Sequence, residues 1–152
     1  MLRLSVAWRV ACGDAPTPSS LVIESRSCWS APTCGFRGID GGKNVRGVKI
    51  HIAVDKHGSP FAVEVGPANE HDAKGIRPVL EQISDLGFEG GVLGDLWYRG
   101  APLDEFAKGI GMLGVDAVAG GRGGVFVPAG LRWTVERTFA WASRYRKAEH
   151  EL

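Results

Sequence analysis

The feature that most restricts the fold is a stretch of alternating apolar and polar residues that turns back on itself, VRGVKIHIAVDKHGSPFAVEVGP (45–67). Apolar side chains occupy every second position in the middle of its first half, which is the period of a strand with one buried face. Its centre, HGSP, contains glycine and proline, two residues typical of turns. The stretch therefore predicts a β-hairpin with strands over residues 45–55 and 61–65.

The segments around this hairpin alternate between strand-like and helix-like patterns. The preceding SLVIES contains β-branched residues and predicts a strand that ends at Glu24, with a loop over 27–42. After the hairpin come a helix over 69–87, a strand over 90–95, a helix over 101–110, a short strand over 116–120 and a closing helix over 131–147. A hairpin followed by this alternation predicts an α/β fold, with helices packed on a mixed sheet.

Bulk properties exclude several classes of protein. The chain of 152 residues fits one domain with a hydrophobic core, and its net charge of +1 carries no global signature of nucleic-acid binding. The three cysteines form no zinc spacing, and their odd number argues against a disulfide framework. No window of 18 apolar residues occurs, so no membrane span is predicted.

The basic residues are nevertheless clustered in two stretches. Such clusters supply the sequence-independent part of DNA affinity by contacting phosphates. The alternative interpretation is solvated charge on a sheet and a helix, and it stays open at this point. The two clusters consist of Arg37, Lys43, Arg46, Lys49 and Lys56, and of Arg132, Arg137, Arg144, Arg146 and Lys147.

Three acids stand out by their position. Glu24 and Asp95 end two predicted strands, and Glu136 lies at the edge of the apolar face of the closing helix. In an open α/β sheet, ligands collect at the carboxyl ends of the strands. Carboxylates that converge there repel one another unless a divalent cation lies between them. Glu136 has two possible roles: a metal ligand, or a surface ion-pair partner of Arg132 and Arg137.

Several other residues have simpler interpretations. Asp40 and Asp55 are predicted to form turns, and the pair His71-Asp72 is predicted to cap a helix. Asn69 is a further candidate for the helix cap, while Pro78 predicts a kink or a late start of that helix. For Trp133 and Trp141, core positions are favoured over a role as platforms for base stacking, whereas Trp29, in a predicted loop, is the better candidate for contact with DNA bases.

Three blocks together resemble a known family. They are IESRSCWSAPTCGFRGIDGGKNVRGVKIHIAVD (23–55), VLGDLWYRG (92–100) and RWTVERTFAW (132–141). They look like the catalytic core of DDE-type insertion-sequence transposases, which share the RNase H-like fold of retroviral integrases. The similarity covers roughly residues 17–147, with the blocks in the family's order.

The resemblance implies phosphoryl transfer on double-stranded DNA, both at the ends of an element and at the target. It assigns catalysis and metal binding to Glu24, Asp95 and Glu136, which would hold two Mg²⁺ or Mn²⁺ ions about 3.5–4 Å apart. It further implies a homodimer in the active state and a nucleoid-associated, cytoplasmic location in a bacterial-type cell. The predicted DNA-binding residues are Lys43, Arg46, Lys49, Arg132, Arg137 and Arg144.

The chain departs from the family pattern at several places. The family carries aspartate at the position of Glu24, whose carboxylate is displaced by about 1 Å or more because glutamate is one methylene longer. Leu96 and Trp97 replace glycines, and Ala129 replaces a tyrosine found in some members. By the resemblance, residues 1–16 correspond to a remnant of an N-terminal helical region and linker, and 17–152 to a catalytic core that is truncated at its C-terminal end.

Three functions remain open from the sequence. The first is a transposase that cleaves and transfers DNA strands with the help of metal ions. The second is a catalytically dead remnant that binds DNA without chemistry, which Glu24 and Trp97 favour. The third is an RNase H-like nuclease that cuts nucleic acid without joining strands, which the three family blocks disfavour.

Overall fold

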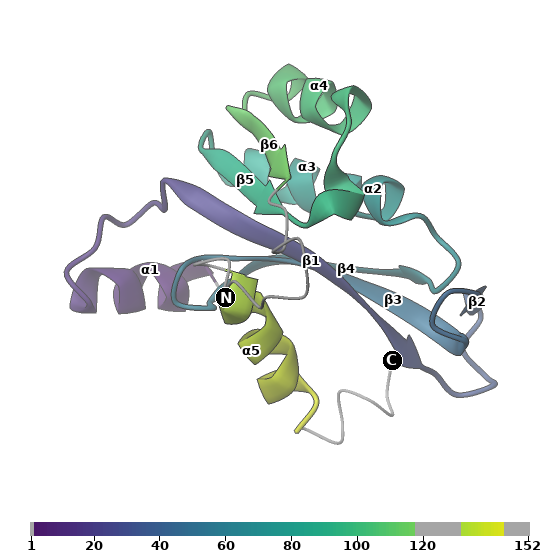
Figure 1. Ribbon diagram of the computed structural model, residues 1–152. Coiled ribbons are helices and arrows are strands. Elements are labelled where there is room, and N and C mark those ends of the chain that lie inside the picture. The colour runs from purple at the N-terminus through teal and green to yellow at the C-terminus, as the bar shows by residue number, and fades with distance from the viewer. Residues whose placement is uncertain (1, 118–131, 145–152) are drawn as a thin grey trace, which may run out of the picture.

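The computed structural model describes residues 2–117 and 132–144 (Figure 1). The helices are α1 (Leu2–Ala11), α2 (Asp72–Gly75), α3 (Arg77–Asp85), α4 (Ala101–Gly109) and α5 (Arg132–Ala142), with a 3₁₀ helix η1 (Leu96–Tyr98). The strands are β1 (Ser20–Trp29), β2 (Gly38–Asp40), β3 (Val45–Val54), β4 (Pro60–Pro67), β5 (Gly91–Gly94) and β6 (Gly114–Ala117).

The six strands form one mixed sheet in the order β2-β3-β1-β5-β6, and β4 also pairs with β3. Strands β1, β3 and β4 are antiparallel neighbours, whereas β5 runs parallel to β1 and β6 runs parallel to β5. The parallel strands are reached through helices, as parallel connections require. The predicted α/β fold, with a mixed sheet, its hairpin and helices packed on the sheet, is confirmed.

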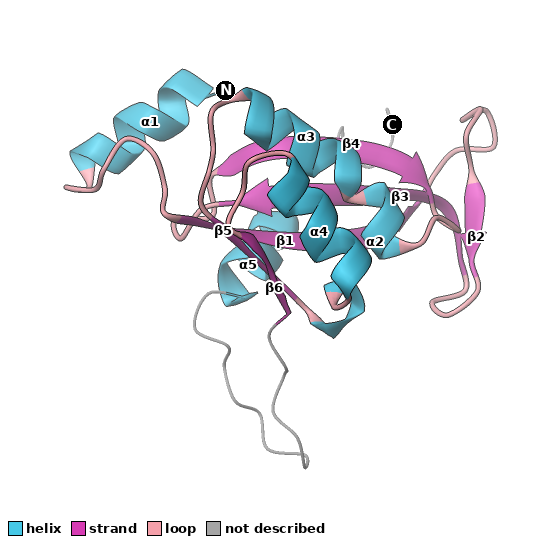
Figure 2. Ribbon diagram, turned by 90° about the horizontal axis from the view of Figure 1, so that it is seen from above, coloured by secondary structure: helices cyan, strands magenta, loops and turns pink. Residues whose placement is uncertain are grey.

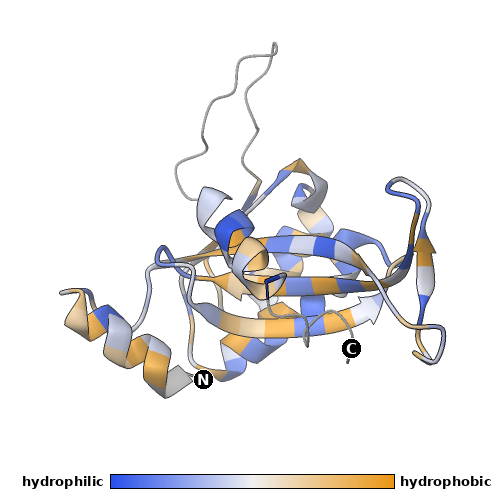
Figure 3. Ribbon diagram, turned by 90° about the horizontal axis from the view of Figure 1, so that it is seen from below, coloured by the Kyte–Doolittle hydropathy of each residue, from blue (hydrophilic) through white to orange (hydrophobic). Residues whose placement is uncertain are grey.

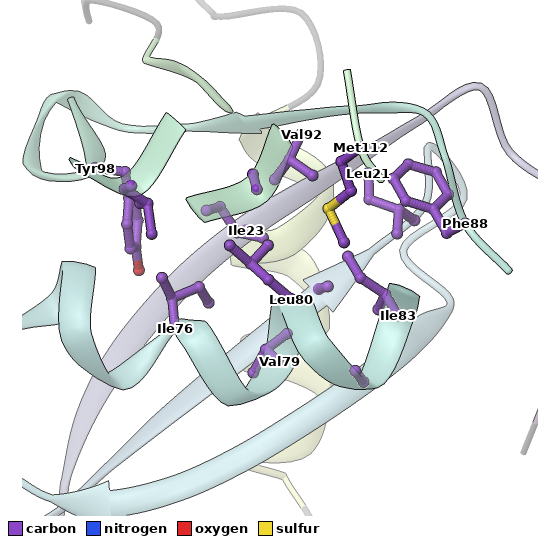
Figure 4. Close-up of a cluster of buried hydrophobic side chains, with 14 residues drawn as sticks. Leu21, Ile23, Ile76, Val79, Leu80, Ile83, Phe88, Val92, Tyr98 and Met112 are labelled. Atoms are coloured by element: carbon purple, nitrogen blue, oxygen red, sulfur yellow. The ribbon is translucent and has the colours of Figure 1, made fainter. Parts of the chain in front are cut away.

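Hydrophobic and hydrophilic residues are interspersed along the strands of the sheet (Figure 3). Because successive side chains of β1 point to opposite faces, they divide the core between the two faces of the sheet. Leu21 and Ile23 belong to a cluster of buried residues that includes Leu80 of α3 and Leu103 of α4 (Figure 4). Val22 points the other way and packs with residues of β3 and α5 in a smaller cluster. Helices α3 and α4 therefore cover one face, and α5 lies on the opposite face (Figures 1 and 2).

The hairpin turn is fixed by Asp55, as the sequence predicted for this residue. One of its carboxylate oxygens accepts hydrogen bonds from the backbone amides of His57 and Ser59, at 2.9 and 3.0 Å. Gly58 adopts φ = +79°, a conformation that favours glycine. The other carboxylate oxygen lies 2.9 Å from the Arg9 guanidinium of α1, and both side chains are buried. No local pattern indicated this ion pair, because its two residues lie 46 positions apart.

Two predicted boundaries were wrong. Strand β1 does not end at Glu24 but continues to Trp29, so part of the predicted loop is strand, because residues 25–29 pair with β3. The predicted Asn69 cap is also incorrect: His71 is the N-cap of α2, and its ring accepts a hydrogen bond from the amide of Ala73. The interruption predicted from Pro78 is present, since α3 starts at Arg77 with proline in its first turn.

The remaining boundaries differ by small amounts. Strand β6 covers 114–117, whereas a strand over 116–120 was predicted, and α5 ends at Ala142. Residues 118–120 and 145–147 of those predictions lie outside the described part of the chain. None of the helices within the described residues is long and apolar enough to cross a membrane.

Candidate active site

Two of the predicted acids are positioned by adjacent parallel strands, Glu24 within β1 and Asp95 directly after β5. The register of β1 and β5 pairs Val22 with Leu93, and continuing it by two residues brings Glu24 beside Asp95. Both carboxylates line one cavity of about 570 Å³. Glu24 lies in the middle of β1, where its pairing partner on β3 is Ile52, and only Asp95 follows the end of a strand.

The backbone orients Asp95 through a short cap. Asp95 precedes η1 with extended backbone angles (φ = −78°, ψ = 179°), and its carboxylate accepts a hydrogen bond of 2.8 Å from the amide of Trp97. This bond holds one carboxylate oxygen in place at the mouth of the turn. The Glu24 carboxylate accepts a bond of 3.2 Å from the amide of Ser25.

Tyr98 packs beneath both acids. A Cβ atom at Gly94 would lie 2.7 Å from the Tyr98 ring and 3.1 Å from the Ile23 side chain, so the tyrosine touches the residue before Asp95 and requires glycine there. Burial raises the pKa of Tyr98 well above its usual value, and the carboxylates of Asp72, Glu24 and Asp95 raise it further, against an opposing effect of the Ser25 hydroxyl. Its hydroxyl therefore stays neutral beneath an acidic cavity.

A buried lysine forms part of the cavity wall. Lys49 is only 7% exposed, and its ammonium lies 2.8 Å from the Asp72 carboxylate and donates to the carbonyl of Glu70 at 2.6 Å. Lys49 was among the predicted DNA-binding residues, and these bonds would compete with a phosphate contact. Lys43 and Arg46 are exposed, as a phosphate contact requires.

Asp40 lines the same cavity and forms a turn, as predicted. One oxygen of its carboxylate accepts a hydrogen bond of 2.5 Å from the Ser27 hydroxyl, and the other accepts from the backbone amides of Gly42 and Lys43 at 3.1 Å. The bond from Ser27 is the main reason that the pKa of Asp40 is lowered. Asp40 therefore contributes a further negative charge to the cavity wall while its oxygens hold the turn.

Glu136 lies on α5, which covers the face of the sheet to which Glu24 belongs. Val22 packs against Val135, and Glu24 is two residues further along β1, hence on the same face. The hydroxyl of Thr138 donates to the carbonyl of Gly58 at 2.8 Å, so this flank of α5 faces the hairpin turn. With about 100° between successive helical residues, Glu136 lies on the opposite flank and is exposed.

The three acids do not form one closed metal site. Among residues 2–117 and 132–144, no group of three or more histidine, cysteine, aspartate or glutamate residues is arranged to hold a metal ion. The structure thus brings Glu24 and Asp95 together and leaves Glu136 on a helix over the same face. The side chain of Arg132 lies outside the described part of the chain.

Arg137 forms a stack that the sequence did not predict. Its guanidinium lies 4.3 Å from the ring centre of Trp133 and 4.7 Å from that of Trp141, and it donates to the carbonyl of His57 at 2.7 Å. The ion pair between Glu136 and Arg137, which was one of the two roles left open for Glu136, is not formed.

The predicted core positions of Trp133 and Trp141 were wrong, because each side chain is 50% exposed. The spacing W-x₃-R-x₃-W places all three on one helical stripe and could have indicated the stack. Arg144, beyond the end of α5, is exposed.

The chain was compared with known proteins. Residues 20–113 match the family described as "Transposase DDE domain", a range that contains Glu24 and Asp95 but not Glu136. The chain is 29% identical over 137 residues to the "Putative transposase for insertion sequence element IS402" of Burkholderia cepacia, with 83% of this chain and 62% of that protein covered. Among solved structures it is similar to the catalytic core domain of BIV integrase, with 13% identity, a TM-score of 0.48, and 86% of this chain and 76% of that chain covered. The chain thus spans less than two thirds of the length of the curated relative.

Proposed function

We propose that this chain, which belongs to the transposase DDE domain family, serves an insertion sequence by cleaving DNA strands and joining them to a target in metal-dependent phosphoryl transfer. The observation that carries the proposal is that Glu24 of β1 and Asp95, which follows the neighbouring parallel strand β5, line one acidic cavity. Membership of the family supports the reaction class, and the relative of Burkholderia cepacia supports the insertion sequence as its context.

The residues present fit a divalent cation of the Mg²⁺ type. Such ions prefer oxygen ligands, and Glu24 and Asp95 offer two carboxylates from neighbouring strands. Glu136 is the third ligand in this proposal, because α5 covers the face on which Glu24 lies. When bound, two such ions would supply Lewis acidity and a more acidic attacking hydroxyl.

The remaining roles belong to the protein's own groups. The amide of Trp97 keeps the carboxylate of Asp95 oriented, and the neutral hydroxyl of Tyr98 adds no further negative charge below it. The exposed side chains of Lys43, Arg46 and Arg144 would bind DNA phosphates, together with Arg132 and Arg137. We extend the proposal to double-stranded DNA as substrate and to a homodimer as the active form.

A second candidate function is DNA binding without chemistry. Two observations favour it: the longer Glu24 side chain stands where the family has aspartate, and no three-carboxylate group is assembled within the described residues. Mg²⁺ demands near-ideal octahedral geometry, so a displaced carboxylate weakens the site. Such a protein would bind DNA with a steep dependence on salt and would need no divalent ion.

An assay of metal-dependent DNA nicking distinguishes the two functions. Its substrate is supercoiled plasmid DNA that carries the two ends of the insertion sequence. The native chain would be assayed in Mg²⁺ and in Mn²⁺ beside Asp95→Asn, Glu24→Gln and Glu136→Gln. Asparagine preserves an oxygen that can accept from the Trp97 amide, so a loss of nicking reports on charge and not on folding. Glu89→Gln is the matched control, because Glu89 is exposed and lies outside the cavity.

We expect the native chain and the control to nick DNA and the three site variants to fail. Glu24→Asp is assayed beside these variants. If it is the single protein that nicks DNA, the extra methylene of Glu24 silences an otherwise competent site. DNA binding with no nicking by any variant would instead support the second candidate function. Nicking that persists in Asp95→Asn would exclude Asp95 from the proposed reaction.

A further inference from the structure

Trp133, Arg137 and Trp141 form an exposed stripe along α5. Large aromatic side chains are usually buried, yet two of them are half exposed here, four residues on either side of an arginine. The two indoles lie away from the sheet, since the sheet is contacted by Val135 and Phe139 on the other side of the helix, and Arg137 between them reaches the hairpin turn. The stripe therefore does not contribute to the core.

The stripe is held in place before any partner binds. The guanidinium of Arg137 stacks on both indole rings, at 4.3 and 4.7 Å, and is tied to the hairpin turn by its bond to the carbonyl of His57. Thr138 adds a second bond from α5 to the same turn, to the carbonyl of Gly58. Side chains that are ordered in the free protein lose little conformational entropy when a ligand binds.

The chemistry of the stripe selects its partner. Indole rings stack on nucleobases of any sequence, and neighbouring arginines bind the phosphates, which is the usual composition of a surface for single-stranded nucleic acid. Arg144 extends the positive charge beyond the end of α5. A second copy of the same face would bring these cations against each other, whereas a polyanion is complementary to them.

We propose that the Trp133–Arg137–Trp141 stripe stacks unpaired bases of the DNA strand that leaves the proposed active site. This inference rests on the proposed function, because it uses the position of Glu136 on the adjacent flank of the same helix. A strand that passes Glu136 would next meet the stripe. Stacking on an indole requires a base that has left the double helix, so the stripe favours unpaired over paired DNA.

The test measures DNA affinity in the absence of divalent ions, so that no cleavage is required. Fluorescence anisotropy would follow the binding of the full chain to a labelled oligo(dT) strand and to a duplex of equal length. The variants are Trp133→Leu, Trp141→Leu, the double variant, and Trp133→Phe with Trp141→Phe as the conservative pair. Trp8→Leu is the matched control, since Trp8 is a similarly exposed tryptophan on α1. Circular dichroism melts would verify that each variant is folded.

We expect each leucine variant to weaken binding to the single strand by about tenfold, with partial recovery in the phenylalanine pair. The slope of affinity against salt should not change, because no phosphate contact is removed. Binding to the duplex and the behaviour of Trp8→Leu should stay within about twofold of the native chain. Unchanged single-strand affinity in the double variant would overturn the inference, as would self-association that disappears with the same substitutions.

The nicking assay separates this inference from the proposed function. Nicking that persists alongside unchanged single-strand affinity in the double variant would remove the stacking role and leave the enzyme in place. If the native chain does not nick DNA and the double variant binds the single strand tenfold more weakly, the proposed enzymatic function is contradicted. The role of the stripe in binding single-stranded DNA is then still supported.

Discussion

The two faces of the sheet are covered very differently. Among residues 2–117 and 132–144, fourteen buried residues form the cluster under α3 and α4 and five form the cluster under α5, so most of the apolar burial of the described residues lies on one face. The α5 face also keeps an apolar groove of about 320 Å³ between β1, β3, β4 and the end of the helix. Glu24 belongs to this more open face. Stability is thus concentrated on one side of the sheet and the proposed chemistry on the other. Substitutions on the two faces should therefore affect stability and activity separately.

The largest effect is expected in the core under α3. Leu80 is fully buried there, and Leu80→Ala should lower the free energy of unfolding by about 2–5 kcal/mol through lost burial and a residual cavity. Urea denaturation measures the change. Leu113→Ala is the control: its side chain is 75% exposed, so a change within about 0.5 kcal/mol is expected. Equal losses in the two variants would contradict the assignment of stability to this face.

A smaller effect is expected where this core meets the candidate site. Gly94→Ala places a methyl group 2.7 Å from the Tyr98 ring and should cost about 1–3 kcal/mol by overpacking. It should also reduce nicking, because Asp95 follows directly. Gly91→Ala in the same strand meets nothing within 4 Å and should leave nicking close to native. Loss of nicking in both variants would mean that activity depends on β5 as a whole and not on the packing of Tyr98 against Gly94.

The α5 face should respond less in stability than in function. Thr138→Val removes the hydrogen bonds from its hydroxyl to the carbonyls of Gly58 and Thr134, at a cost of about 0.5–1.5 kcal/mol. Since α5 carries Glu136, nicking should fall by more than this loss of stability explains. Thr138→Ser keeps the hydroxyl and should restore both properties. If Thr138→Val lowers the free energy of unfolding as much as Leu80→Ala does, the proposed difference in stability between the two faces is contradicted.

The smallest effect concerns pH. The pKa of Tyr98 in the folded protein lies above its unfolded value of about 10, because burial disfavours the phenolate. Its contribution to stability is therefore complete below about pH 10 and is lost as the pH rises towards the folded pKa. Tyr98→Phe cannot titrate, so its urea midpoint should fall less steeply above about pH 10 than that of the native chain. Parallel curves for the two proteins would show that Tyr98 is not the responsible group.

The sequence predicted those parts of the structure that local patterns determine. The hairpin over 45–67 was readable from its alternation and turn residues, and Asp95 from its place directly after a short apolar strand. The length of β1 could not be predicted from its sequence, because its second half is polar and becomes a strand only through pairing with β3. Pairing of this kind depends on a distant segment and leaves no local periodicity.

Dependence on distant segments also accounts for the errors at single side chains. Arg9 pairs with Asp55, 46 residues away, and Lys49 pairs with Asp72, so neither charge could be assigned a partner from its neighbours in sequence. Trp133 and Trp141 were predicted to be buried because tryptophan usually is, but their stripe faces away from the sheet. The proximity of Glu24 to Asp95 likewise follows from strand order, which the chain sets only when folded.

The hairpin turn at 55–59 has a consequence for the order of folding. Its own hydrogen bonds join residues two to four positions apart, whereas α5 reaches it through bonds that span 80 residues. Closing a long loop is entropically costly and usually comes after local contacts have formed. We therefore expect the hairpin to form early and α5 to dock late. Native-state hydrogen exchange tests this order: the amides of α5 should open at a lower free energy than those of β3, and equal protection would refute it.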